Sequence, residues 1–269
     1  MSLGLDLSAS DAKLDRAEEH LKSLESESSS VVKKRHSHTL RPEMDDQTGW
    51  CTIWMRANDV REPTVSAIAG DYIHNLRSAL DYIITALVDK TAGLTLAKMH
   101  QFPIYDDQTT YGDAIWRPGE GVGRGSLKGI RHGLAIIEPL QPYHTQPDHD
   151  ADPLAQLNRL SNADKHREIL GFKPVLQPGE VDVIISEGTV LNTETPLKPN
   201  WVNNEFEVGR VLFAQPFPSQ IRAKADLSVT PLFSIEPFGK DQKGIALDLP
   251  TLGEIRVHVR MITDLFKSI

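Results

Sequence analysis

The chain has 269 residues, of which 39% are hydrophobic and 25% are charged, and its formal net charge at pH 7 is −8. This composition is ordinary for a globular protein, so it excludes bulk disorder and a collagen-like chain. The acidic balance, with a pI of about 5.7, argues against a protein whose main task is to coat nucleic acid, because such domains carry a basic face.

The cysteine content and the hydropathy indicate where such a chain would work. Its only cysteine, Cys51, leaves no intramolecular disulfide and no zinc site built from cysteines. No basic segment followed by an apolar stretch opens the sequence, and the longest nearly uncharged apolar run, 82–88, is far short of the roughly 20 residues of a membrane span. We therefore expect a cytoplasmic protein that needs no membrane, no cofactor and no metal.

The first half of the chain predicts two helices and a hairpin. Residues 10–28 form the first helix, because Ser10 can cap it and apolar residues recur at helical steps; the serines at 28–30 are expected to end it. Residues 31–58 look extended around a turn at 45–49, which predicts a hairpin. The strongest helix follows over about 64–89, with an apolar face wide enough to need burial on more than one side.

The second half alternates helices with β-like runs. The predicted elements are, in chain order, a short buried strand or extended loop at 100–105, an irregular excursion at 106–126, a helix at about 127–139, a helix at about 153–169, β-like runs at 181–185, 206–214 and 227–235, and a last helix at about 250–268. Pro250 suits the first turn of that last helix.

Together these elements predict an α+β fold: a bundle of about five helices with an antiparallel β-sheet whose strands lie near 31–58 and 170–240. We expect a single domain over residues 1–269. Within it, 60–170 plus 250–268 would form the helical core and 170–240 a β-rich subdomain.

Three short motifs have weak functional readings. The glycine-rich stretch 118–126 could cradle phosphate, but it lacks the strand and the Gly-Lys-Ser/Thr of known phosphate loops, so a surface loop is favoured. The loop 143–152 holds two histidines and three aspartates, which could bind a metal ion; Asp152 before Pro153 also reads as a helix cap. The basic run at 33–36 is favoured as a solvated strand end over a contact with an acidic partner.

Two helical segments carry polar residues in an unusual pattern. In and just after the string Gly-Asp-Tyr-Ile-His-Asn-Leu-Arg-Ser-Ala-Leu-Asp at 70–81, short polar side chains at 71, 74/75, 78, 81 and 85 fall on one stripe. The candidate ligand-binding residues on this helix are Asp71, His74, Asn75 and Arg77. In Leu-Asn-Arg-Leu-Ser-Asn-Ala-Asp-Lys-His-Arg at 157–167, Arg159, Asn162 and His166 share a sector of about 100° with Asn158. Three readings stay open: a closed structural network between the two helices, a functional site, or a solvent-exposed face.

These strings, with Phe102-Pro-Ile and Gln141-Pro-Tyr143, resemble a family of uncharacterised bacterial and phage-borne proteins of actinobacterial type, over about residues 60–170. That resemblance implies no established activity. The chain also resembles, more weakly, the HEPN helical bundles, many of which are metal-independent ribonucleases with an Arg, four to six residues and a His on one helix. Arg159 and His166 have six residues between them, but Leu160 stands where those bundles usually place a polar residue.

The HEPN resemblance implies a mechanism and a partner. His166 would exchange a proton with an RNA hydroxyl, Arg159 would stabilise charge on the phosphate, and Asn162 would orient either group. Lys165 and Arg167 would hold flanking phosphates, and a homodimer is implied because such enzymes form composite dimers.

Two functions are therefore carried forward. The first is a binding or regulatory protein that uses the polar stripes, including Asp71, His74, Asn75 and Arg77, for an unknown ligand or protein partner. The alternative is a HEPN-like endoribonuclease in phage defence or phage–host conflict, with RNA as its substrate. A third reading, a metal-dependent enzyme or other hydrolase using the loop 144–152, is less favoured.

Overall fold

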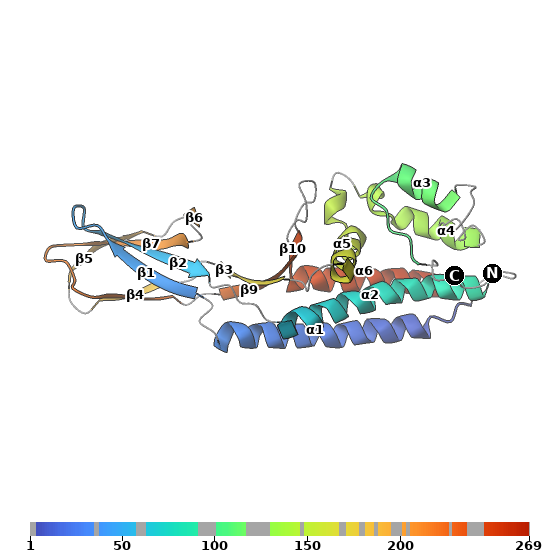
Figure 1. Ribbon diagram of the computed structural model, residues 1–269, viewed down its shortest axis with the longest axis horizontal. Coiled ribbons are helices and arrows are strands. Elements are labelled where there is room, and N and C mark those ends of the chain that lie inside the picture. Colours follow the sequence, from blue (N-terminus) through green and yellow to red (C-terminus); the bar gives the residue numbers. More distant parts are fainter. Residues whose placement is uncertain are drawn as a thin grey trace. The chain divides into compact units, whose positions relative to one another are not determined.

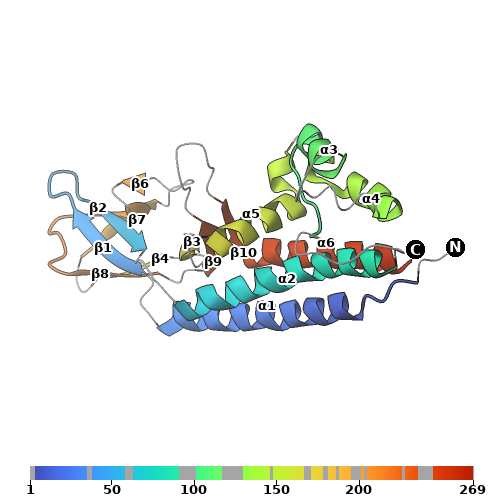
Figure 2. The same cartoon turned by 45° about the vertical axis from the view of Figure 1, so that its right-hand side comes forward.

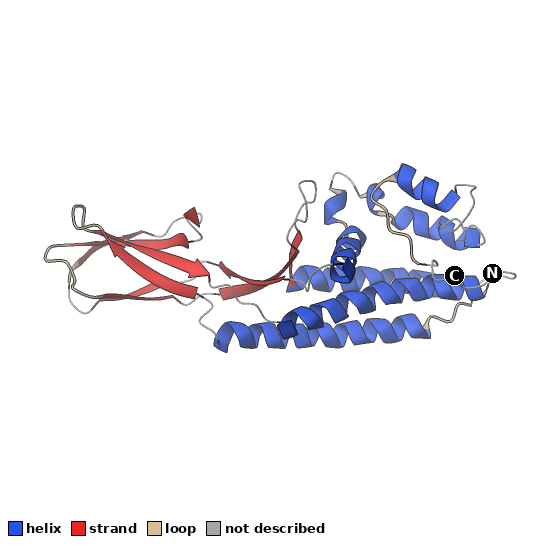
Figure 3. Ribbon diagram, viewed as in Figure 1, coloured by secondary structure: helices blue, strands red, loops and turns tan. Residues whose placement is uncertain are grey.

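The computed structural model describes residues 4–34, 38–57, 63–90, 101–116, 130–145, 148–166, 171–177, 181–185, 188–194, 201–202, 205–225, 228–235 and 245–268. The described residues form α-helices and antiparallel strands (Figure 3), which confirms the predicted α+β fold. The chain divides into two compact units. We call Met1–Ser26, Pro63–Gly171 and Phe233–Ile269 the helical unit, and Glu27–Glu62 and Phe172–Leu232 the sheet unit. Whether the two fold as the single predicted domain stays a prediction.

Six α-helices lie in the described residues, and most of their length belongs to the helical unit (Figure 1). They are α1 (Ser8–Lys34), α2 (Pro63–Asp89), α3 (Gln108–Trp116), α4 (Arg131–Ile137), α5 (Pro153–His166) and α6 (Leu249–Lys267). Three single 3₁₀ turns, Glu138–Leu140, Pro142–His144 and His149–Ala151, connect α4 to α5.

Helix α2 is the centre of the helical unit. Sixteen of its residues are buried, and it packs against both α5 and α6. The predicted packing of the helices at 70–89 and 153–169 is thereby confirmed, although the described part of α5 ends at His166. The Tyr72 hydroxyl donates a hydrogen bond to the carbonyl of Leu252 at the start of α6, so even the polar end of this buried ring is satisfied.

Helix α1 runs alongside α2 and α6, as the two views in Figures 1 and 2 show. It extends six residues beyond the predicted end at residue 28, so residues 31–34 are helical and the prediction of an extended start was wrong. The buried positions Leu14, Ala17, Leu24 and Ser28 continue at helical steps. Tertiary burial of this stripe therefore overrides the preference of serine for turns.

The sheet unit has a central antiparallel sheet. Its strands β1 (His38–Met44), β2 (Trp50–Ala57), β7 (Glu205–Phe213) and β5 (Val190–Glu194) lie in the order β1-β2-β7-β5, and β6 (Trp201–Val202) also pairs with β7. A second antiparallel pair joins β4 (Val181–Ile185) to β8 (Ile221–Ala225). The predicted hairpin is confirmed: His38 pairs with Ala57 and Met44 with Cys51.

Alternate residues of β2 build the core of the sheet unit. Cys51, Ile53 and Met55 are fully buried and pack with Val208, Val211 and Phe213 of β7. The turn before β2 needs Gly49, because its φ is +80° and a Cβ there would lie 2.8 Å from the carbonyl oxygen of Phe213. The two-residue period of the pattern and a single turn glycine thus explain why this segment is a hairpin.

The remaining strands are β3 (Gly171–Gln177), β9 (Ser228–Ile235) and β10 (Ile245–Asp248). The boundary between the units falls inside α1, at the start of α2, at the start of β3 and inside β9. The sequence did not reveal β3, β5, β8 or β10. The segment 106–126 was predicted to be irregular, but it contains the helix α3. Asp107 caps this helix by accepting a hydrogen bond of 2.7 Å from the amide of Thr110.

Candidate functional site

The polar stripe predicted on α2 separates into exposed and buried residues. Asp71 and His74 are exposed, whereas Asn75 and Arg77 are buried. The Asn75 side chain donates to the carbonyl of Asp71 (2.7 Å) and accepts from Lys13 of α1 (3.2 Å). His74 lies 3.5 Å from the hydroxyl of Ser78 on the same helix. Asn75 therefore faces α1, and its contacts serve helix packing.

Arg77 and Asp81 hold an extended segment against α2. The guanidinium of Arg77 donates to the carbonyl oxygen of Phe102 (2.6 Å), and Asp81 accepts from the amide of the same residue (2.9 Å). The two charges lie 3.5 Å apart. Because Phe102 is fully buried, its backbone groups need such partners. These contacts describe a structural clamp.

The candidate site residues on α5 have different surroundings. Arg159 forms an ion pair with Asp150 and lies 4.0 Å from Asp106, while Asn162 is exposed. His166 ends α5, but its side chain and that of Lys165 lie outside the described residues, as does the whole of Arg167. A HEPN-like convergence of Arg159, Asn162 and His166 therefore stays a prediction, and Arg159 already has acidic partners.

In the loop before α5 the acidic side chains serve as caps and ion-pair partners. Asp148 caps the 3₁₀ turn at Asp150, and Asp152 accepts from the amides of Leu154 and Ala155 and from the hydroxyl of Thr145. His144 lies 2.9 Å from Glu138. In the parts of the chain that the structure describes, no group of three or more His, Cys, Asp or Glu is placed to hold a metal ion.

Glu138 is a partly exposed carboxylate that bonds to two residues at the start of that loop. Its carboxylate accepts hydrogen bonds of 2.9 Å from the Tyr143 hydroxyl and from His144. Burial opposes its ionisation, but these two donors outweigh burial and hold the pKa of Glu138 below its ordinary value. Tyr105, Tyr111 and Tyr143 stack edge to face beside it, and burial raises the pKa of Tyr111 to about 12. The cluster is closely packed and anchors the loop.

A hollow is found elsewhere, where α5 and α6 begin. This pocket has a volume of about 410 Å³, is open to solvent, and is lined by Pro153, Pro250, Gly253, Glu254, Arg256, Val257, His258 and Met261. Its rim is apolar: Val257 is 51% exposed and Met261 is 62% exposed. The opposite face of α6 supplies the buried residues Leu252, Ile255, Val259 and Ile262. One helix thus supports the core with one face and lines the pocket with the other.

Local sequence explains how the pocket is placed. Asp248 caps α6 by accepting from the amide of Thr251 (2.9 Å), and Pro250 occupies the first turn. Asp152 and Pro153 begin α5 in the same way. Two proline-led helix starts therefore meet at the pocket. None of the sequence motifs predicts this pocket, although apolar residues at 257 and 261, four apart and off the buried stripe, are a usable signal for it.

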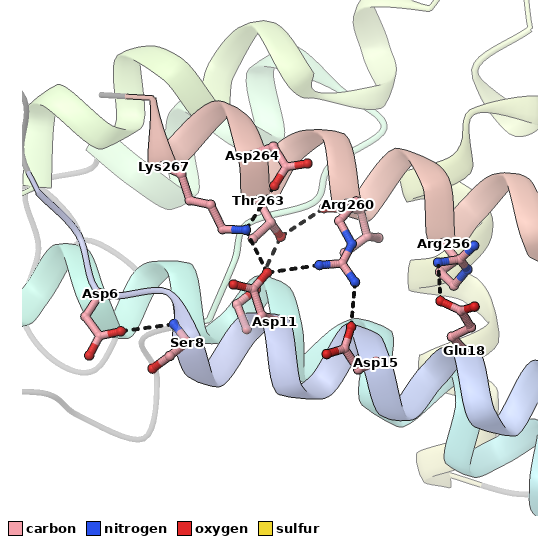
Figure 4. A network of polar contacts seen from close by, with 12 residues as sticks. Asp6, Ser8, Asp11, Asp15, Glu18, Arg256, Arg260, Thr263, Asp264 and Lys267 are labelled. Carbon is pink, nitrogen blue, oxygen red and sulfur yellow. Dashed lines mark hydrogen bonds and ion pairs between the residues drawn. The ribbon is translucent and has the colours of Figure 1, made fainter.

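The charged groups at the pocket differ in how they are compensated. Arg256 extends from α6 to Glu18 of α1, with 3.3 Å between Nη1 and the carboxylate (Figure 4). Burial lowers the pKa of His258, with a smaller opposing effect from Asp152, so the imidazole is neutral at pH 7. Glu254 is exposed and, among the described residues, has no ion-pair partner.

Comparison of the chain with protein-family models, with curated proteins and with solved structures finds no match. Both resemblances drawn from the motifs therefore stay predictions. No helix within the described ranges has the length and apolar character needed to cross a membrane.

Proposed function

We propose that the protein is a binding or regulatory protein and that the pocket at the starts of α5 and α6 is its ligand site. The observation that supports this proposal is a shallow, open hollow of about 410 Å³ with an apolar rim and a small number of polar groups. Binding sites for small molecules have volumes of roughly 300–1,000 Å³ and the same mixture of lining residues.

The exposure of two apolar side chains at the pocket also supports a binding role. Val257 and Met261 are large apolar residues left more than half exposed on a helix whose other face is fully packed. A ligand that covers them would remove apolar surface from water, which contributes roughly 25 cal/mol for each Å². The polar stripe of α2 offers no such gain, because its exposed members, Asp71 and His74, are polar. We further propose action in the cytoplasm, consistent with Cys51 being a free thiol.

The experiment that tests the binding proposal uses benzyl alcohol, a small uncharged probe with an apolar body. Titration into the full chain, labelled with ¹³C at the methionine methyl groups, should shift the Met261 signal in a saturable way. Val257→Gln should weaken that binding, and the exposed position of Val257 means that its fold should be kept. Leu265→Gln is the matched control, because Leu265 is 40% exposed on the same helix but does not line the pocket.

Two outcomes would overturn the binding proposal. One is the absence of saturable binding of benzyl alcohol, or an equal loss of affinity for it in Val257→Gln and Leu265→Gln. The other is cleavage of RNA by the wild-type chain in the presence of a chelator, lost in His166→Ala without loss of stability. That result would establish the ribonuclease predicted from the HEPN resemblance instead.

A further inference from the structure

Building on the proposed ligand site, we infer that the pocket at the starts of α5 and α6 selects a small organic monocation: an apolar body that carries one ammonium group, held by Glu254. This inference names the ligand class and rests on the binding proposal. The charges that surround the pocket support it.

The positive groups at the pocket are already compensated. The guanidinium of Arg256 pairs with Glu18 on α1 through Nη1 (Figure 4), while its Nε is buried and has no hydrogen-bond partner among the described residues. The two helix starts carry partial positive charge, but each has a capping carboxylate, Asp152 on α5 and Asp248 on α6. His258 contributes a neutral imidazole at pH 7.

Unlike the positive groups at the pocket, the carboxylate of Glu254 has no partner of opposite charge among the described residues. It stands one turn before Val257 and His258 on the exposed side of α6, and it lines the pocket. Within the described residues no cation lies within ion-pair distance of it. A ligand ammonium at Glu254 could place its apolar body on Val257 and Met261, since residues three and seven positions further along a helix share that face.

The volume of the pocket decides between two sources of such a cation. A volume of about 410 Å³ suits a free small molecule, whereas a protein partner would need a contact surface of many residues. We therefore assign the pocket to a free amine and treat a basic side chain of a partner protein as the competing outcome.

The test compares three probes that share one aromatic body: benzylammonium, benzyl alcohol and benzoate. Binding to the full chain is followed by the Met261 methyl signal at low salt. We expect benzylammonium to bind about two- to fivefold more tightly than benzyl alcohol, the range that a solvent-exposed ion pair contributes, and benzoate to bind most weakly. The preference for the cation should shrink in 0.5 M NaCl.

Two variants isolate the carboxylate. Glu254→Gln should lower the affinity for benzylammonium to about that for benzyl alcohol, which removes the preference for the cation. Asp71→Asn removes an equal charge from an exposed position on α2 and should keep the preference. Thermal midpoints of both variants establish that they are folded.

The outcomes separate the two proposals. Binding of all three probes with equal affinity, or tightest binding of benzoate, would overturn the monocation assignment and leave the ligand site standing. Absence of binding by every probe would overturn both. Tighter binding of Nα-acetyl-lysine amide than of benzylammonium would assign the pocket to a protein side chain and so overturn the small-molecule assignment.

Discussion

At the scale of single residues, the contact partner of a polar side chain determines its role. Arg77 and Asp81 have the composition of a site, yet they bind the two backbone groups of Phe102. Removing one partner of such a set leaves a buried polar group unsatisfied, at about 1–3 kcal/mol. Glu254, on the exposed side of α6, lacks an ion-pair partner in the described part of the chain and is therefore available to a ligand.

Two glycines provide a test of packing at this scale. An ideal Cβ at Gly133 of α4 would lie 2.5 Å from a methyl group of Leu87, which is 4% exposed. Gly133→Ala gains helix propensity but overpacks a closed core, so we expect the free energy of unfolding to fall by about 1–2 kcal/mol. Urea unfolding measures this change.

The matched control is Gly70→Ala. A Cβ there would lie 2.8 Å from Oδ1 of Asp164, the end of an exposed side chain that can rotate away. We expect its stability to stay within about 0.5 kcal/mol of wild type or to rise by up to about 1 kcal/mol. Equal stability of Gly133→Ala and Gly70→Ala would contradict the close packing of Gly133 of α4 against Leu87 of α2.

At the scale of elements, helices α1 and α6 are joined by a seam of ion pairs over a buried contact. Arg260 pairs with Asp11 (3.0 Å) and Asp15 (2.8 Å), and Lys267 pairs with Asp11 (2.7 Å), as Figure 4 shows. Beneath them the hydroxyls of Ser10 and Thr263 lie 3.2 Å apart, both fully buried. The apolar stripe holds the helices together, and the charges fix their register.

We predict that Arg260→Gln lowers the free energy of unfolding by about 0.5–1 kcal/mol at 0.05 M salt, because the pairs are partly exposed. The loss should be about half as large in 0.5 M NaCl, since salt screens such charges. Arg16→Gln is the control: its partner is Glu19 on its own helix, and both side chains are more than 60% exposed, so we expect a change of a few tenths of a kcal/mol at either salt concentration. A salt-independent loss in Arg260→Gln would contradict the ionic character of the seam.

The start of α6 predicts a pH dependence. Hydrogen bonds from the side chain and amide of Thr251 hold the pKa of Asp248 below its ordinary 3.8. A carboxyl with a lowered folded-state pKa stabilises the fold above its unfolded pKa, and this contribution is lost as the pH falls through the folded value. We expect Asp248→Ala to cost about 0.5–2 kcal/mol at pH 6 and distinctly less at pH 2.5.

Urea unfolding at the two pH values measures this difference. Asp248→Asn keeps the capping acceptor without the charge, so it should cost less than Asp248→Ala, and the difference between the two variants should not depend on pH. A cost of Asp248→Ala that grows as the pH falls would show that the carboxylate does not stabilise the start of α6.

At the scale of the whole molecule, two units each have a core of their own, and the chain passes between them inside α1 and inside β9. Because α1 and β9 each have residues in both units, unfolding of one unit would disrupt these two elements in the other. We therefore expect the units to unfold together, as the predicted single domain requires. Cys51, fully buried in the sheet unit, reports on this because burial raises the pKa of its thiol and shields it from reagents.

The measurement is pulsed thiol labelling of Cys51 across a urea titration, compared with loss of helix by far-UV circular dichroism. We expect the two midpoints to coincide. A labelling midpoint at lower urea than the loss of helix would show that the sheet unit is a separate domain.

The sequence alone determined the long helices, apart from the end of α1, and the stripes that face the cores, because both depend on local periodicity; the short helix α3 was not predicted. The stripe at 14, 17 and 24, the alternation at 51, 53 and 55, and the wide apolar face of α2 all appear in the printed order of residues. Short strands such as β5, whose residues are all exposed, have no apolar pattern, so only pairing with β7 creates them.

Only the tertiary structure decided which polar residues are occupied and where a hollow forms. The features that distinguish the stripe at 71–81 from the pocket at 250–261 join positions far apart in the chain: Arg77 bonds to Phe102, Arg256 pairs with Glu18, and Pro153 and Pro250 line one pocket. A local pattern states which side chains share a helix face. It cannot state what lies opposite that face, because this depends on how the other helices pack.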